Sequence, residues 1–121
     1  MKILVVDDER AICKLISNML AILGHESILA GNGLEAVDRF SSDRQQIDLV
    51  ITDLNMPIMD GYEAIRQIRK INPNSMIVSM SAVASNPPRD TTFLEKPFTL
   101  ATLRSSLDLV VTGGERRSNA G

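Results

Sequence analysis

The sequence predicts a single α/β domain in which helices cover both faces of a doubly wound, five-stranded parallel sheet. Five short apolar segments typical of buried strands alternate with segments whose apolar residues recur every three or four positions, as they do on one face of a helix. The chain has 121 residues, which is enough for one domain with one good core. No internal repeat interrupts this alternation.

The strand segments are residues 2–6, 26–30, 49–52, 76–80 and 92–95. The first reads Ile3 to Val6 and the third Leu49 to Thr52, and both are continuous runs of apolar or β-branched residues. Strands that are buried on both faces of a parallel sheet have this composition. We therefore expect the third strand to lie near the centre of the sheet.

Four segments have the apolar spacing of amphipathic helices. Gly24 ends the first helix, and Asn72-Pro73-Asn74 ends the third. The residues expected to face the core are Ile12, Leu15, Ile16, Met19, Leu20 and Leu23, then Leu34, Val37 and Phe40, then Tyr62, Ile65 and Ile68, and finally Leu100, Leu103, Leu107 and Val110.

The connection between the fourth and fifth strands is unusually short. Residues 83–90 have to carry the chain back along the sheet, and they include Asn86-Pro87-Pro88. Eight helical residues would span only about 12 Å, whereas a strand is about 17 Å long. The prolines also disfavour helix and remove two donors. We therefore expect a loop in place of a fourth crossover helix.

The last ten residues, TGGERRSNAG, contain no large apolar side chain that would anchor them to a core. The sequence therefore predicts a domain over residues 1–111 and a flexible tail, or the start of a linker, over residues 112–121.

Composition excludes several classes of function. Lys and Arg number 13 against 15 Asp and Glu, so the net charge of −2 gives no general attraction to nucleic acid. No apolar run approaches the roughly 18 residues of a membrane span. The single Cys13, which we expect to be a buried structural thiol, fits a cytoplasmic location. One His and one Cys cannot build a usual zinc site, and we expect His25 to be an exposed loop residue.

Chemically functional residues follow several of the strands. Because the carboxyl ends of parallel strands meet at one edge of the sheet, we expect Asp7, Asp8, Asp53, Ser81 and Lys96 to lie together there. Three carboxylates need a counter-charge, and ligation by oxygen without histidine favours Mg²⁺. Asp53 ends a central strand and is the best placed nucleophile, because aspartate can form an aspartyl phosphate.

Each of these residues also has a simpler interpretation. Asp7 or Asp8 would serve equally well as the cap of the first helix. Asp53 would simply end a strand in water, Lys96 would be a solvated surface lysine and Ser81 a hydroxyl at a strand end. The convergence of five such residues on one edge favours a shared function.

Several motifs resemble the receiver domains of bacterial two-component response regulators. They are ILVVDDE, NGLEA, DLVITDLNMPIMDG, MSA at 80–82 and FLEKPF at 93–98, and the resemblance covers nearly all of residues 2–111. It implies a flavodoxin-like fold with strand order 2-1-3-4-5. It also implies a signalling switch, not an enzyme acting on other molecules.

The resemblance implies a role for each acid at the sheet edge. Asp53 would accept a phosphoryl group from the phosphohistidine of a sensor histidine kinase or phosphotransfer protein. Asp8, Asp53 and the backbone carbonyl of Asn55 would bind Mg²⁺ directly, and Asp7 would do so through water. Lys96 would pair with the phosphoryl oxygens.

The resemblance also implies a conformational switch made by Ser81 and Phe93. The serine hydroxyl would move toward the phosphate, and the aromatic ring would swing into the space that it leaves. Because the ring is Phe and not the commoner Tyr, a signal that uses a tyrosyl hydroxyl is absent.

Further positions match residues that tune such a site. Small Ala82 would leave access to the phosphoryl group, and Asn55 and Val83 occupy positions that set the rate of dephosphorylation. Apolar Val83 cannot orient a hydrolytic water. The Lys96-Pro97 peptide bond would be cis.

Two other functions stay open at the level of sequence. One is an interaction domain that works without phosphorylation, although such a domain would be expected to lose one of the five edge residues. The other is a Mg²⁺-dependent phosphohydrolase, which needs a second catalytic acid; Leu54-Asn55 follows Asp53 and supplies none. In a switch with a shortened crossover, the downstream protein or output domain would read the last strand and helix, or the ordering of residues 83–90.

Overall fold

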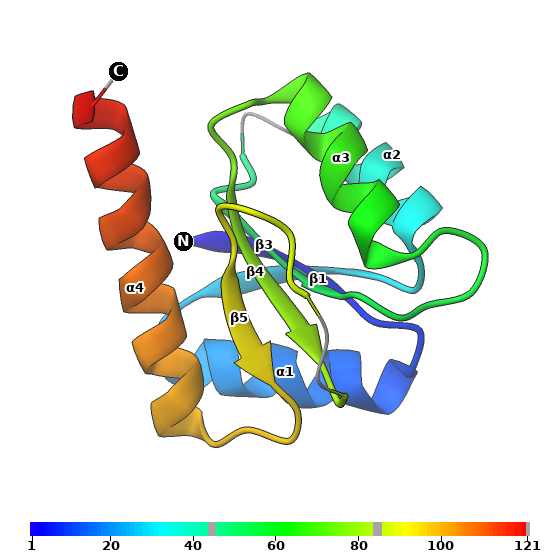
Figure 1. Ribbon diagram of the computed structural model, residues 1–121. Coiled ribbons are helices and arrows are strands. Elements are labelled where there is room, and N and C mark those ends of the chain that lie inside the picture. Colours follow the sequence, from blue (N-terminus) through cyan, green and yellow to red (C-terminus); the bar gives the residue numbers. More distant parts are fainter. Residues whose placement is uncertain (44–45, 84–85, 121) are drawn as a thin grey trace.

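The predicted strands are present in the computed structural model, which describes the chain except for residues 44–45, 84–85 and 121. All neighbouring strands pair in parallel, in the order β2-β1-β3-β4-β5 (Figure 1). The predicted bounds are confirmed to within one residue. The strands are β1 Lys2–Val6, β2 Glu26–Ala30, β3 Leu49–Asp53, β4 Met76–Ser81 and β5 Thr92–Glu95.

Four helices in the described part of the chain cover the sheet, two on each face. α1 and α4 lie on one face, and α2 and α3 on the other (Figure 1). This arrangement confirms the doubly wound architecture. The helices are α1 Arg10–Ile22, α2 Gly33–Asp43, α3 Gly61–Ile71 and α4 Leu100–Ala120.

The core is divided by the sheet into two apolar clusters. Alternate residues of β1 point to opposite faces, so that Ile3 and Val5 pack under α1 and α4 whereas Leu4 and Val6 pack under α2 and α3. All five residues of β3 are buried. A central strand enclosed on both faces ends at Asp53, and this burial fixes the position of its carboxylate.

The connection between β4 and β5 contains no helix in its described residues, 82–83 and 86–91, as predicted; residues 84–85 lie outside the described part. We call residues 86–91 the crossover loop. Two side chains of α3 hold it: the Tyr62 hydroxyl donates to the Asn86 carbonyl at 3.0 Å, and the Arg69 guanidinium donates to the Arg89 carbonyl at 2.5 Å.

α4 continues past Val111 to Ala120, so residues 112–120 are helical here, whereas the sequence predicted a flexible tail. The apolar spacing stops at Val111, but a helix can continue on its own backbone hydrogen bonds. The Thr112 hydroxyl adds a bond to the Asp108 carbonyl at 2.9 Å. The division of the chain at residue 111 stays a prediction. None of the described helices is long and apolar enough to cross a membrane.

The burial of Cys13 agrees with the prediction from the sequence, whereas that of His25 differs from it. Cys13 is buried, as predicted, and its thiol lies 3.3 Å from the Asp7 carbonyl; burial raises the pKa of this thiol. His25 lies in the loop between α1 and β2, as predicted, but it is half-buried and not exposed. Its Nδ1 accepts a hydrogen bond from the Met1 ammonium at 3.0 Å. The pairing of β1 with β2 brings the chain end beside it.

Candidate functional site

The predicted edge residues come together at the carboxyl end of the sheet. Asp7 follows β1, Asp53 ends β3, Ser81 ends β4 and Lys96 follows β5. Parallel pairing aligns these four strand ends, with Asp53 opposite Met80 and Ser81 opposite Glu95. Residues that are up to 89 positions apart in sequence therefore meet in one place.

Three acids form a cluster at this edge. Carboxylate oxygens of Asp7, Asp8 and Asp53 lie within 4.8 Å of one another; Asp7 and Asp53 are buried, whereas Asp8 is exposed. The N-cap of α1 is Glu9, and no side chain caps this helix. Asp7 instead accepts a hydrogen bond from the Glu9 backbone N–H at 2.9 Å, which leads the chain from β1 into α1.

The ammonium of Lys96 lies between two of these acids. Its Nζ is 2.5 Å from Asp7 Oδ2 and 3.4 Å from Asp53 Oδ2. Burial by itself lowers the pKa of Lys96, but the hydrogen bond to Asp7 and the charges of Asp53 and Asp7 outweigh it, and the pKa of Lys96 is raised. Lys96 is therefore a charged residue of the cluster and not a solvated surface lysine.

The carboxyl of Asp53 has a raised pKa. Desolvation by burial is the main cause, and the negative charge of Asp7 adds to it, while Lys96 and the Asn55 backbone N–H act in the opposite direction. Lys96 and the Asn55 backbone N–H therefore do not fully offset the effect of burial and of Asp7 on the ionised form of Asp53. A bound cation would lower the free energy of the ionised form.

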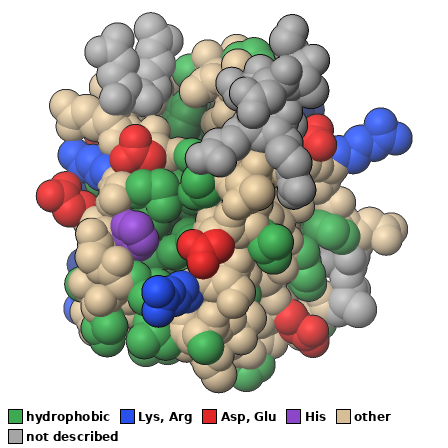
Figure 2. Space-filling view, turned by 90° about the vertical axis from the view of Figure 1, so that its left-hand side faces the viewer, with side chains coloured by type: hydrophobic (Ala, Val, Ile, Leu, Met, Phe, Trp, Pro, Cys, Tyr) green, Lys and Arg blue, Asp and Glu red, His purple; other side chains and the backbone are tan. Residues whose placement is uncertain are grey.

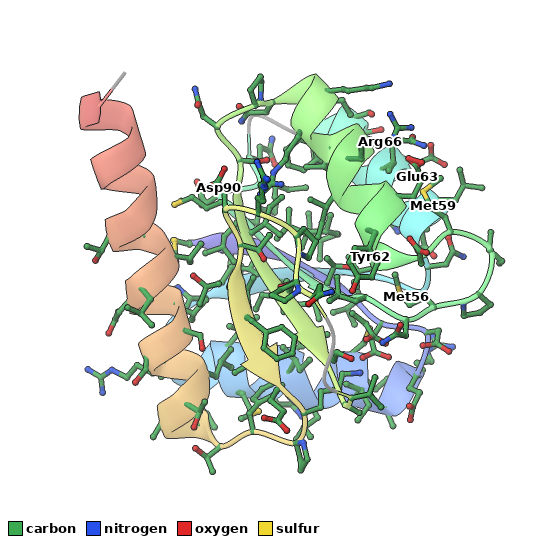
Figure 3. The ribbon with its side chains drawn as sticks, viewed as in Figure 1. Met56, Met59, Tyr62, Glu63, Arg66 and Asp90 are labelled. Atoms are coloured by element: carbon green, nitrogen blue, oxygen red, sulfur yellow. The ribbon has the colours of Figure 1, made fainter. Side chains whose placement is uncertain are left out.

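The loop between β3 and α3 is held close against Asp53. A Cβ placed on Gly61 would lie 2.1 Å from the Asp53 carbonyl oxygen, so only glycine allows this approach. The carboxylate of Asp60 caps α3 by accepting from the Glu63 N–H at 2.9 Å. Met56 lies on this loop, and Tyr62 lies in the first turn of α3 (Figure 3).

Ser81 and Asn55 are directly bonded. The Asn55 side-chain amide donates to Ser81 Oγ at 2.9 Å, and the Val83 backbone N–H donates to the same oxygen at 3.2 Å. Ser81 is fully buried, whereas Asn55 is exposed. The sequence singled out all three residues, but it did not predict this contact.

The remaining predicted residues surround the cluster. Phe93 is half-buried and packs against the apolar cluster under α2 and α3. Ala82 and Val83 are exposed beside Ser81. The Lys96-Pro97 bond is cis, as the resemblance implied.

A pocket of about 250 Å³ adjoins the cluster and was not predicted. It lies between α1 and the chain that leaves β5. Leu15 was expected to face the core but is 55% exposed, because it lines this pocket. The helical spacing placed Leu15 on the apolar face of α1, but it could not show how far neighbouring elements cover that face. The lining residues are Ile12, Leu15, Ile16, Met19, Ala82, Lys96, Pro97 and Phe98.

The donor set of the acid cluster fits Mg²⁺. All three side chains offer oxygen, and no described histidine or cysteine joins them. Mg²⁺ typically uses one or two carboxylates and keeps several waters, which exposed Asp8 would permit. The arrangement is suited to charge neutralisation beside a carboxylate nucleophile.

Comparison with known proteins identifies the class. The family model for the response regulator receiver domain matches residues 3–108, and the chain therefore belongs to this family. Receiver domains of two-component systems are generally signalling switches, and aspartyl phosphate and magnesium are typical of the family.

Curated relatives include both kinds of two-component protein. The chain is 36% identical to the response regulator MprA of Mycobacterium avium over 85% of its length and 34% identical to the autoinducer 1 sensor kinase/phosphatase LuxN of Vibrio campbellii over 87%. It spans only 47% of MprA and 13% of LuxN.

Solved structures agree with this assignment. A response regulator receiver protein from Sinorhizobium medicae superimposes with a TM-score of 0.85 at 30% identity, covering 94% of this chain and 96% of that one. The response regulator TrrA from Thermotoga maritima, solved in complex with Mg²⁺ and BeF, gives a TM-score of 0.80 at 32% identity, covering 90% and 97%.

Proposed function

We propose that this chain is a phosphorylation-activated switch in which Asp53 accepts a phosphoryl group from the phosphohistidine of a sensor histidine kinase or phosphotransfer protein. The observation that carries the proposal is the position of the Asp53 carboxylate, within one cluster with Asp7, Asp8 and the Lys96 ammonium. Phosphoryl transfer depends mainly on positioning and on neutralisation of charge, and these residues supply both.

In this reaction a carboxylate oxygen of Asp53 attacks phosphorus, the new O–P bond forms, and the N–P bond to the donor imidazole breaks. The electron pair of the broken N–P bond stays on the imidazole nitrogen, which takes up a proton from solvent. Asp53 must be ionised to attack, and its raised pKa makes neutralisation by neighbouring groups important.

Mg²⁺ held by Asp8, Asp53 and the Asn55 backbone carbonyl, with Asp7 acting through water, would neutralise the phosphoryl oxygens. Lys96 would move its ammonium from Asp53 Oδ2 to a phosphoryl oxygen while keeping its bond to Asp7. Ser81 would turn its hydroxyl toward the same group.

The consequences of phosphorylation would reach the surface through Ser81 and Phe93. As Ser81 moves, the half-buried Phe93 ring would swing inward, which alters β5 and the crossover loop joined to it. A downstream protein or an output domain would read these elements and α4. Ala82 would keep the phosphoryl group accessible, and Asn55 and Val83 would set its lifetime.

Incubation with acetyl phosphate and Mg²⁺, followed by measurement of the intact mass, tests this function. We expect one phosphoryl adduct that is absent in Asp53→Asn and in the presence of a chelator. Asp48→Asn is the matched control, because Asp48 is an exposed acid just before the opposite end of the same strand. That variant should retain the adduct.

Two results would contradict the proposal, and each would support a different function. Turnover of many phosphate esters without a stable adduct would indicate a small-molecule phosphohydrolase. The absence of any adduct would indicate an interaction domain that works without phosphorylation. For the output route, hydrogen exchange at residues 86–96 with and without a phosphate mimic should differ; equal protection would count against reading through β5 and the crossover loop.

A further inference from the structure

We infer that the side chain of Asn55 is a positioning residue that holds the Ser81 hydroxyl in its resting orientation and so sets how readily this protein reaches the activated form. The inference rests on the proposed function for its consequence, but the contact itself exists in the resting protein. Asn55 Nδ2 donates to Ser81 Oγ at 2.9 Å across 26 residues of sequence.

Ser81 Oγ has little freedom in this state. It accepts from Asn55 and from the Val83 backbone N–H at 3.2 Å, and a hydroxyl oxygen has two acceptor sites. Because Ser81 is fully buried, water cannot readily replace either donor. The two donors together therefore favour one rotamer of the Ser81 side chain.

Turning the hydroxyl toward a phosphoryl group on Asp53 would break both contacts. The side chain of Asn55 is exposed and can then bond to water. Losing its bond to Ser81 therefore costs only the net free energy of one ordinary hydrogen bond. The bond from Asn55 to Ser81 thus stabilises the resting form and not the activated form. Removing the Asn55 donor should therefore favour the activated form.

Asn55 is also joined to the acceptor itself. Its backbone N–H donates to Asp53 Oδ1 at 3.4 Å, while its side chain reaches Ser81. A change at the Asp53 carboxylate that moves this backbone segment would also move the donor away from Ser81. One residue thus links the acceptor aspartate to the hydroxyl that is proposed to respond to it.

The test is a double-mutant cycle between Asn55→Leu and Ser81→Ala, with beryllium trifluoride and Mg²⁺ as the probe. Leucine has nearly the shape of asparagine but donates no hydrogen bond. We expect Asn55→Leu to lower the Kd for the probe about fivefold, the equivalent of one net hydrogen bond. In the Ser81→Ala background the same substitution should have no effect, because its target is gone.

A second readout does not depend on activation. In the protein without Mg²⁺ or probe, Asn55→Leu should broaden the rotamer distribution of Ser81 and shift the Val83 amide resonance. Equal effects of Asn55→Leu on the Kd in both backgrounds, or an unchanged Ser81 rotamer, would overturn the inference. If the wild-type chain does not bind the probe, the proposed function fails, and the Ser81 rotamer still decides the role of Asn55.

Discussion

In the absence of metal, Lys96 supplies positive charge beside the buried carboxylates of Asp7 and Asp53. Its ammonium contacts Asp7 and Asp53, and its side chain is only 14% exposed. Removing one partner of a buried ion pair leaves an uncompensated charge. We expect Lys96→Met to lower the free energy of unfolding of the metal-free protein by about 2 kcal/mol, as measured by urea denaturation.

Added Mg²⁺ should recover part of this loss, because the cation neutralises the same carboxylates. Lys70→Met on α3 is the control, since Lys70 is exposed and should tolerate the change in either condition. Equal stability of Lys96→Met and wild type without Mg²⁺ would mean that the ion pairs contribute nothing.

His25 should make stability depend on pH. Desolvation by burial lowers its pKa below the ordinary value of 6.5, and the charge of the Met1 ammonium adds to this. The unfolded chain therefore binds the proton more readily, and the free energy of unfolding falls as pH drops below about 6.5 and levels off below the folded-state pKa. The effect should be under about 1 kcal/mol, because the ring is partly solvated.

His25→Gln should remove this part of the pH dependence in denaturation curves measured between about pH 7.5 and about pH 5, a range that spans the ordinary pKa of histidine. His25 lines a pocket of about 370 Å³ between α1 and α4, together with Arg104 and Asp108. Figure 2 shows this face, with the histidine in purple among hydrophobic side chains. An unchanged slope in His25→Gln would exclude His25 as the source.

At the scale of elements, the crossover loop is attached to α3 instead of forming a helix. Tyr62 and Arg69 donate to its carbonyls, and Thr91 bonds to Ser79 at 2.9 Å. Figure 3 shows Tyr62 on α3 and Asp90 near the start of β5. We expect Tyr62→Phe combined with Arg69→Gln to speed amide exchange at residues 86–91 and to cost about 1 kcal/mol per bond lost.

Arg66→Gln is the matched control for this experiment. Arg66 lies on the same helix but forms an exposed ion pair with Glu63, a pair that contributes little to stability. If exchange in the crossover loop rises as much in Arg66→Gln as in the double variant, the attachment to α3 is not what orders the loop.

Gly61 makes the close packing of α3 on β3 possible. An added Cβ would collide with the Asp53 carbonyl and the Leu54 backbone. Gly61→Ala should therefore lower stability by about 2 kcal/mol in thermal or urea unfolding. Gly113→Ala, within α4 and with open space around its Cα, should instead raise stability by about 1 kcal/mol. Similar effects of the two substitutions would contradict this account.

The sequence predicts most at the level of strands and topology, because burial leaves a strong pattern. Apolar runs located all five strands, and parallel pairing then placed Asp7 beside Lys96. Side-chain contacts of exposed residues leave no such pattern. Tyr62 was assigned to the buried face of α3 but is 38% exposed and bonds to the crossover loop, and the bond from Asn55 to Ser81 has no periodic signal.

At the scale of the whole molecule, one fold explains why these residues meet. Two apolar clusters fix the sheet from both sides, and the sheet brings the ends of β1, β3, β4 and β5 to a common edge. The short crossover changes the α3 side of the molecule and leaves this edge complete. Membership of the receiver family covers residues 3–108, the part of the chain that builds the edge.

The central claim is that this edge directs a phosphoryl group to one particular carboxylate. Treatment with acetyl phosphate and Mg²⁺, reduction of the acyl phosphate with borohydride and peptide mass spectrometry locate the modified residue directly. The account predicts conversion at Asp53 alone, within the peptide that carries β3. Modification of Asp7 or Asp8 in its place, or of no aspartate at all, would contradict it.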